Sequence, residues 1–182
     1  QWGEECLSRF IGMWAFVLVD TIQKTAFASR DRFGVKPLYY WPMPDGSLAI
    51  ASEIKQFAVL PGWAPRMNLE RSYDFLVRGL LDHTGETMFS GVMQVRGGHA
   101  LSISLGNPEI PSLRAWYQLP AGRSDLSDEA AVAGLRDRLE DAVTLHLRSD
   151  VKVGSCLSGG LDSSSIVCLV NNRLRSIGKE EI

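Results

Sequence analysis

Serine hydroxyls, one carboxylate and two adjacent glycines are concentrated in a short stretch of the chain, Cys156–Ser165, with the sequence CLSGGLDSSS. Gly159 and Gly160 have no Cβ atom, so the backbone there can take a positive φ and bring N–H groups close to a ligand. A helix that begins at this point adds unpaired N–H donors and the positive end of its dipole. The stretch therefore predicts a phosphate-binding loop made of backbone amides and hydroxyl groups.

The absence of a lysine from this loop narrows the kinds of phosphate group that it is expected to bind. A Walker A loop has a Lys before its Ser or Thr, and no Lys stands here. The carboxylate of Asp162 favours Mg²⁺-bound pyrophosphate over bare phosphate and makes this residue the candidate metal ligand. The alternative is a purely structural turn, in which Ser158 caps the helix and the glycines only make the bend. The order Ser-Gly-Gly-x-Asp-Ser-Ser favours the binding loop over that alternative.

Elements on both sides must hold the loop. The apolar run Val151–Leu157 predicts a strand, and the apolar periodicity after the loop predicts a helix through Leu174. Upstream, Ser127 can cap a helix that continues to Arg148 along one apolar stripe. Helix, strand, glycine turn and helix form the opening of a parallel α/β domain, with the ligand at the carboxyl end of the strand. The linker Pro120–Ser127 separates this domain, so we predict domains at residues 1–120 and 121–182.

The first 120 residues predict a different architecture. Strand-forming residues and hairpin turns recur at short intervals and indicate an antiparallel sheet with one buried face. We expect strands at Met13–Val19, a buried one, at Thr25–Ser29, in the aromatic segment that follows the Gly34 turn and runs to Tyr40, and at Ser47–Ala51, His99–Leu105 and Arg114–Leu119. A short helix is expected to open at Ser52–Lys55 and end before Pro61, and a second helix to run from the cap Asn68 to Leu81. Gly85–Gly98 and Asn107–Pro111 are expected to be loop or turn. The charges of Arg30, Asp31, Arg32 and Lys36 are expected to form a solvated turn with a weak surface ion pair.

Composition excludes several classes of function. Nineteen basic and 21 acidic residues give a net charge of −2, and no basic stripe is interleaved with aromatic residues, so nucleic acid is not an expected partner. No apolar run is long enough to span a membrane, and we expect a cytoplasmic protein. Three cysteines, without the spacing of a metal site, indicate a reducing compartment. Cys156 and Cys168 are expected to be buried in the core.

Taken together, these segments resemble the glutamine-dependent asparagine synthetase family. The loop is similar to that of pyrophosphate-loop ATPases. The resemblance is carried by Gly12–Phe16, Arg30–Tyr40, Ser52–Lys55, Gly97–His99, Trp116–Tyr117 and Ser149–Ser165. The first half is similar to the later part of an α+β N-terminal nucleophile (Ntn) glutaminase domain with antiparallel sheets. The second half is similar to the start of an α/β synthetase domain of the adenine nucleotide alpha hydrolase-like type.

The resemblance implies a two-site amidotransferase. One site hydrolyses glutamine, and ammonia passes through an internal channel to the other, where ATP adenylates the aspartate side chain and releases pyrophosphate. It implies ATP and Mg²⁺, small-molecule substrates, and allows a homodimer of the parent protein. By match to the family's loop, ATP and pyrophosphate would be bound by Leu157, Ser158, Gly159, Gly160, Leu161, Asp162, Ser163 and Ser164, with Mg²⁺ at Asp162.

Some positions depart from the family. Its glutaminase nucleophile is a cysteine at the processed N-terminus, whereas the first residue here is Gln1 and Cys6 lies inside the chain. We therefore assign no glutaminase catalytic residue and expect the 182 residues alone to be inactive. Gly97 and Lys152 stand where relatives often have Pro. Three alternatives stay open: a relative that closes a β-lactam or amidates another carboxylate, a non-catalytic nucleotide-binding module, and a two-domain protein whose glycine turn binds nothing.

Overall fold

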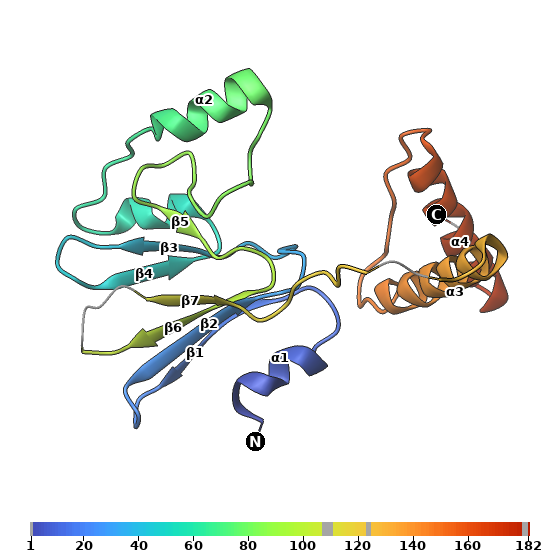
Figure 1. Ribbon diagram of the computed structural model, residues 1–182, viewed down its shortest axis with the longest axis horizontal. Coiled ribbons are helices and arrows are strands. Elements are labelled where there is room, and N and C mark those ends of the chain that lie inside the picture. Colours follow the sequence, from blue (N-terminus) through green and yellow to red (C-terminus); the bar gives the residue numbers. More distant parts are fainter. Residues whose placement is uncertain (1, 107–110, 123–124, 180–181) are drawn as a thin grey trace. The chain divides into compact units, whose positions relative to one another are not determined.

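The computed structural model describes residues 2–106, 111–122, 125–179 and 182, and the chain divides into two compact units, Gln1–Pro120 and Ala121–Ile182. Figure 1 labels their helices and strands. The first unit contains a 3-10 turn η1 (Gly3–Glu5), α1 (Cys6–Arg9), β1 (Ala15–Asp20), β2 (Thr25–Arg30), β3 (Tyr39–Pro42), β4 (Leu48–Ala51), a 3-10 helix η2 (Ile54–Val59), α2 (Leu69–Arg78), β5 (Met93–Gln94), β6 (His99–Ser104) and β7 (Ser112–Ala115). The second unit contains α3 (Asp128–His146) and α4 (Leu161–Ser176).

The strands of the first unit form two antiparallel sheets, in the orders β1-β2-β6-β7 and β4-β3-β5. The expected antiparallel pairing is confirmed, but the strands divide between two sheets, whereas the hairpin pattern indicated a single sheet. The first two hairpin strands pair with each other, but β2 takes β6 as its second neighbour, so the first hairpin is separated from β3 and β4. Two strands also differ from expectation: β5 lies in a segment expected to be loop, and β7 ends where the N–H groups of Trp116 and Tyr117 turn to the Gly98 carbonyl.

The two sheets pack on each other through apolar side chains. Their shared cluster joins Ala28 of β2 and Leu101 of β6 to Tyr40 of β3. Successive strand residues point to opposite faces, so Trp41 turns to the other side of the second sheet, where it packs against Phe57 of η2. The first unit therefore has three layers: one sheet, a second sheet, and the η2 helix.

The strand β1 is present but is not buried as expected. It is the edge of its sheet, with β2 as its neighbour, and the side chains of Val17, Leu18 and Val19 are exposed. Its apolar run is typical of a strand covered on both faces. Among the described residues, the first unit does not provide that cover.

Local capping signals were predicted correctly. The Asn68 side chain accepts a hydrogen bond from the N–H of Arg71 at 3.3 Å and starts α2. The Ser127 hydroxyl does the same for the N–H of Ala130 at 3.3 Å and starts α3. The short helix after Ser52 is confirmed as the 3-10 helix η2, with a capping box at Glu53. Of the turn expected at Asn107–Pro111, residues 107–110 lie outside the described part of the chain.

Two charged side chains of the Arg30–Lys36 turn, those of Arg30 and Asp31, are buried, which corrects the expectation of a solvated ion pair. Asp31 is 1% exposed, and its carboxylate accepts four backbone hydrogen bonds. The donors are the N–H groups of Phe33 (3.1 Å), Val35 (3.0 Å), Lys36 (3.0 Å) and Trp14 (3.3 Å). Burial raises the pKa of Asp31, but these donors together hold it below the ordinary carboxyl value. The carboxylate therefore organises the turn from inside.

Arg30 is buried beside it and is satisfied in the same way. Its guanidinium donates to the carbonyl oxygens of Lys36 (2.6 Å), Gly34 (2.6 Å) and Val95 (2.8 Å), and to the Gln94 side chain (3.3 Å). Backbone and amide groups thus compensate both buried charges, as burial requires. Sequence alone could not show this, because Val95 and Gln94 are far from the turn along the chain.

Gly97 lets a second segment approach this turn closely. A Cβ atom at Gly97 would lie 2.6 Å from the Gly34 nitrogen and 2.7 Å from the Phe33 carbonyl carbon, which is closer than real Cβ atoms come. The next residue, Gly98, donates its N–H to the Asp31 carbonyl at 2.8 Å. The Gly97-Gly98 pair is therefore required by backbone packing in this chain.

In the second unit, α3 and α4 pack through Val143, Val170 and Leu174. The strand predicted at Val151–Leu157 is not formed, which is a further correction: these residues have no strand pairing. A strand is stable only when its backbone groups pair with a neighbour, and the described residues of this unit contain no strand. Without that sheet, Cys156 and Cys168 are exposed, contrary to the expectation that they are core residues.

Candidate functional site

The glycine loop leads directly into α4. Gly159 has φ = +81°, in the left-handed region that favours glycine, and Gly160 is the N-cap residue of the helix. Gly160 has no side chain to cap the first turn, and no side-chain hydrogen bond does so. The N–H groups at the start of α4 therefore point out of the helix without a side-chain acceptor.

Two serine hydroxyls fold the loop against this turn. The Ser163 hydroxyl donates to the Gly160 carbonyl at 3.2 Å and accepts from the N–H of Ser158 at 3.3 Å. It also lies 2.9 Å from the Ser158 hydroxyl. Ser165 is directed away from the loop, because its hydroxyl donates to the Leu161 carbonyl at 2.8 Å, one turn back in α4. The structure thus brings Ser158 and Ser163 together and separates Ser165 from them.

The rest of the predicted loop is open to solvent. Leu157, Leu161 and Asp162 are exposed, and Ser164 is half-buried with its N–H bonded to the Gly160 carbonyl at 3.2 Å. Asp162 lies in the first turn of α4, where a carboxylate is favoured by the helix dipole. Amide donors, two paired hydroxyls and one carboxylate are thus collected at one solvent-facing helix end.

This donor set fits Mg²⁺ carried by a polyphosphate better than a metal held by protein alone. Within the described residues, no three His, Cys, Asp or Glu side chains are grouped closely enough to hold a metal ion. Mg²⁺ is commonly bound by one or two carboxylates together with substrate phosphates and water. Asp162 could supply the protein ligand and the α4 amides could hold the phosphate oxygens.

A cavity of about 280 Å³ in the second unit lies among apolar residues of α3, Val153–Ser155 and α4. The His146 side chain also lines this cavity. Its Nδ1 atom lies 2.8 Å from the carbonyl oxygen of Ala142 in the same helix. The His146 ring is therefore held against its own helix, α3. The cavity offers apolar packing space, not a reaction centre.

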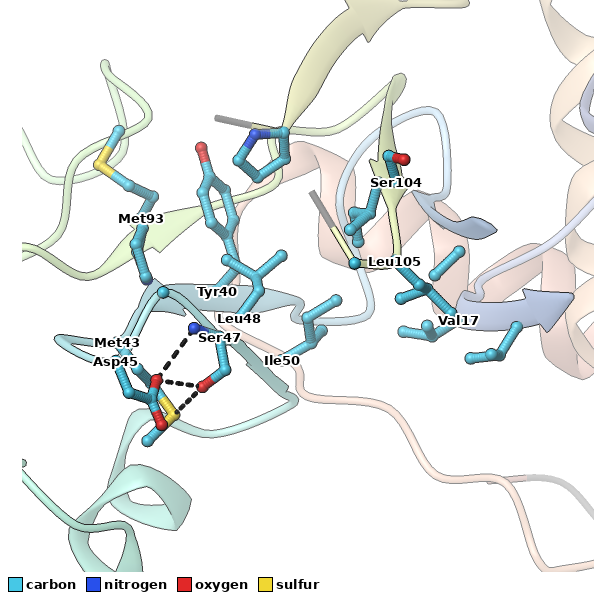
Figure 2. Close-up of a pocket in the computed structure, with 17 residues that line it drawn as sticks. Val17, Tyr40, Met43, Asp45, Ser47, Leu48, Ile50, Met93, Ser104 and Leu105 are labelled. Carbon is cyan, nitrogen blue, oxygen red and sulfur yellow. Dashed lines mark hydrogen bonds between the residues drawn. The ribbon is translucent and has the colours of Figure 1, made fainter. Parts of the chain in front are cut away.

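The first unit has a larger pocket of about 1080 Å³ between its two sheets (Figure 2). Its walls are mostly apolar and include Tyr40, Ile50 and Met93. Burial raises the pKa of Tyr40. At one edge, the hydroxyl and N–H of Ser47 donate to Asp45 at 2.6 and 2.9 Å, and these hydrogen bonds hold the pKa of Asp45 below its ordinary value. The polar groups at this edge are thus engaged with each other within one hairpin turn.

The other two histidines also have structural partners. The Nδ1 atom of His99 lies 2.8 Å from the Gly97 carbonyl, next to the Arg30–Lys36 turn. The Nε2 atom of His83 lies 2.9 Å from the Asp74 carboxylate and 3.0 Å from the Arg71 guanidinium. Cys6, to which no nucleophilic role is assigned, is the first residue of α1 and is half-buried.

Comparison with known proteins identifies both halves of the chain. Residues 1–117 match the glutamine amidotransferase domain family, and residues 134–178 match the asparagine synthase family. The first match covers more than half of the 182 residues, and the second contains the glycine loop and α4. The chain therefore belongs to the asparagine synthetase family of glutamine amidotransferases.

Curated relatives agree with this assignment. The chain is 34% identical to asparagine synthetase [glutamine-hydrolyzing] 3 of Bacillus subtilis, over 98% of the chain and 28% of that relative. It is 36% identical to amidase chyE of Penicillium rubens, over 96% of the chain and 25% of the relative. A putative asparagine synthetase of Methanocaldococcus jannaschii is 31% identical over 91% of the chain and 32% of the relative. The chain thus spans about a quarter to a third of the length of these relatives.

In the part of the chain that the structure describes, no helix combines the length and the apolar character needed to cross a membrane.

Proposed function

We propose that the chain belongs to a larger asparagine synthetase-type ligase, in which its second unit begins the ATP-dependent synthetase domain. The observation that carries the proposal is the uncapped, solvent-facing start of α4 behind Gly159. In this proposal Leu157, Ser158, Gly159, Gly160, Leu161, Asp162, Ser163 and Ser164 hold the pyrophosphate part of ATP. The family match over residues 134–178 supports it, since that range includes the whole loop.

The chemical logic follows from the donors present. A carboxylate is a poor acyl donor, and its adenylation by ATP provides a good leaving group. Amide groups at the start of α4 and the Ser158 and Ser163 hydroxyls stabilise negative charge that develops on departing pyrophosphate. Mg²⁺, when bound, neutralises part of the phosphate charge, and Asp162 is the residue that would orient it.

The first unit is proposed to be the later part of an Ntn-type glutaminase domain. Its antiparallel sheets and the amidotransferase match over residues 1–117 support this. We assign no glutaminase catalytic residue to the 182 residues. Ammonia from that domain would attack the acyl-adenylate, and the products would be an amide and AMP.

The test measures pyrophosphate release from ATP by the parent enzyme in the presence of ammonia and aspartate. Asp162→Ala should slow release at least about 100-fold, because the loop loses its acidic ligand. The matched control is Asp137→Ala, which removes an exposed carboxylate from α3 and should leave the rate unchanged. Unchanged release in Asp162→Ala would refute the assigned role of the loop, and nucleotide binding without any release would favour a non-catalytic module.

A second candidate is a ligase of the same design that amidates a different acid or closes a β-lactam. It is favoured by the 36% identity to a protein named amidase chyE, which is at least as high as the identities to the relatives named asparagine synthetase. Analysis of the amide products formed from a set of candidate carboxylic acids distinguishes the two. Asparagine as the sole product supports the first candidate.

A further inference from the structure

Arg32 joins segments of the first unit that are far apart in the sequence. Its guanidinium donates hydrogen bonds to the carbonyl oxygens of Ser8, at 3.0 Å, and Phe10, at the C-terminal end of α1. The same guanidinium lies over the rings of Trp116 and Tyr117, 5.5 and 5.4 Å from their centroids. One side chain therefore holds both the end of α1 and the segment that follows β7.

The backbone of the segment after β7 is fixed at Gly98. The Gly98 carbonyl accepts the N–H groups of Trp116 and Tyr117, at 2.8 and 3.1 Å. A Cβ atom at Gly98 would lie 2.8 Å from the Tyr117 carbonyl oxygen, so glycine is needed for this approach. Because Gly98 also donates its N–H to the Asp31 carbonyl, the segment rests on the same turn that carries Arg32.

Aromatic rings complete the contact. The Trp116 ring stacks on Trp14, with centroids 5.5 Å apart, and Phe33 meets Tyr117 edge to face at 6.1 Å. The indole N–H groups of Trp14 and Trp116 are buried without an acceptor among the described residues. Because a buried N–H without an acceptor opposes this packing, the rings depend on stacking and on the guanidinium of Arg32. We call these five residues, Trp14, Arg32, Phe33, Trp116 and Tyr117, the exit clasp.

The residues that follow the exit clasp have no regular structure. Residues 118–122 and 125–127 contain no helix or strand, and Gln118, Leu119 and Pro120 are exposed. The second unit begins at Ala121. Since a segment without secondary structure fixes neither distance nor direction, the start of the linker is defined by the exit clasp.

We propose that Arg32 is a positioning residue for glutamine-dependent amidation, because it holds the exit clasp closed. The inference rests on the proposed function, in which ammonia formed by the first unit is used by the second. A reaction that needs two sites of one chain depends on how precisely they are held. An open clasp would free the segment after β7, and ammonia would be lost to solvent before it reaches the acyl-adenylate. Arg32 acts through Trp116 and Tyr117, so it is not a catalytic residue.

The test compares three rates in the parent enzyme: glutamine hydrolysis, amide formation from glutamine, and amide formation from added ammonia. In Arg32→Ala, the amide formed per glutamine hydrolysed should fall at least about threefold. Glutamine hydrolysis and the ammonia-dependent rate should each change by less than about twofold, because the substitution leaves both sites intact. The matched control is Arg9→Ala, which removes a guanidinium that lies 4.7 Å over the Trp2 ring, outside the clasp, and should leave the ratio unchanged.

Three results would overturn the inference. An unchanged ratio in Arg32→Ala would show that the clasp does not serve ammonia transfer. An equal fall in Arg9→Ala would show that the effect is not specific to the clasp. A parallel fall of all three rates would show that Arg32 only stabilises the fold. If Arg32→Ala does not fold, Arg32→Lys keeps the charge but lacks the planar fork of donors, and the ratio should fall in the same direction.

Hydrogen exchange separates the clasp from the proposed reaction. The amides of Trp116 and Tyr117 should exchange at least about tenfold faster in Arg32→Ala. The N–H of Val35, which is bonded to the Asp31 carboxylate, should keep its protection. Because exchange needs neither glutamine nor ATP, faster exchange in an enzyme that forms no amide would leave the clasp standing while the proposed function fails. Unchanged exchange would refute the clasp itself.

Discussion

The Arg30–Lys36 turn and the Leu157–Ser164 loop share an acidic residue and a glycine bend but have opposite structures. Both are short polar segments with an acidic residue and a glycine at positive φ, Gly34 in one and Gly159 in the other. In the turn, the acidic side chain is 1% exposed and accepts four backbone hydrogen bonds. In the loop, the acidic side chain is exposed and the first helical amides lack a side-chain cap.

The difference shows how to separate a structural polar cluster from a binding site. In the turn, the buried Asp31 carboxylate and Arg30 guanidinium make their hydrogen bonds within the protein itself. In the loop, the Ser158 and Ser163 hydroxyls are paired, while the first helical amides of α4 have no side-chain acceptor. Unused, convergent hydrogen-bonding capacity therefore marks the candidate site better than charge density, which is higher in the turn.

The largest expected effect is on the free energy of unfolding, and it comes from replacing the acidic residue of each segment with asparagine. Asp31→Asn removes the charge and directs an NH₂ group at backbone donors, so it should lower the free energy of unfolding of the first unit by about 3 kcal/mol. Asp162→Asn, on the exposed loop, should change stability by less than about 0.5 kcal/mol. Urea-induced unfolding measures both. A small loss for Asp31→Asn would contradict the structural role of this carboxylate.

The next largest expected effect on stability comes from replacing one glycine of each region with alanine. Gly97→Ala places a Cβ 2.6 Å from the Gly34 nitrogen, so backbone must move and stability should fall by about 2 kcal/mol. Gly160→Ala is the matched change in the loop, where φ is −76° and the nearest atom is the Ser158 hydroxyl at 3.5 Å. It should be close to neutral. Thermal unfolding of the two variants compares them directly, and equal losses would remove the distinction.

Gly159→Ala should have a smaller effect on stability and a clear effect on binding. Alanine at φ = +81° costs about 1–2 kcal/mol, and the loop can avoid that cost by changing its shape. The amides of α4 would then no longer converge on a phosphate. We expect the parent enzyme with this change to lose the rise in melting temperature that ATP and Mg²⁺ give the unchanged enzyme. A full rise in the variant would show that the bend is not needed for binding.

The smallest expected effect is on the way in which the stability of the first unit depends on pH. The pKa of Asp31 is lower in the folded state than in the unfolded chain, so its contribution is fully present above the unfolded value of about 3.9. It is lost as the pH falls through the lower, folded value. Asp31→Asn should therefore flatten the acid side of the stability profile, measured by unfolding at a series of pH values. An unchanged slope would mean that other carboxylates dominate.

Signals within a few residues were sufficient to predict much of this fold. Asn68 and Ser127 were identified as caps because capping depends on the next three residues. The hairpins were predicted because their turns are local. The pairing of β2 with β6 joins residues that are 71 to 79 positions apart, as from Ser29 to Ala100 and from Thr25 to Ser104, so the division into two sheets left no local signal. The same holds for the burial of Arg30, whose acceptors include Val95.

The local backbone geometry of the glycine loop was predicted for the same reason. The glycine bend and the start of α4 are properties of adjacent residues, and both are present. The pairing of Ser158 with Ser163 was not foreseen, because it depends on how the loop folds back on the helix. The strand expected before the loop requires a neighbouring strand. The described residues of the second unit do not supply one.

The aromatic clusters of the first unit have a further consequence for measurement. All five tryptophans precede residue 121 and so belong to the first unit. The ring centroids of the stacked pair Trp14 and Trp116 are 5.5 Å apart, and those of Trp41 and Trp63 are 5.0 Å apart. Intrinsic tryptophan emission therefore reports on the first unit alone, while α3 and α4 contribute to circular dichroism without fluorescing. Recording both signals in one titration separates the melting of the two units without any added dye.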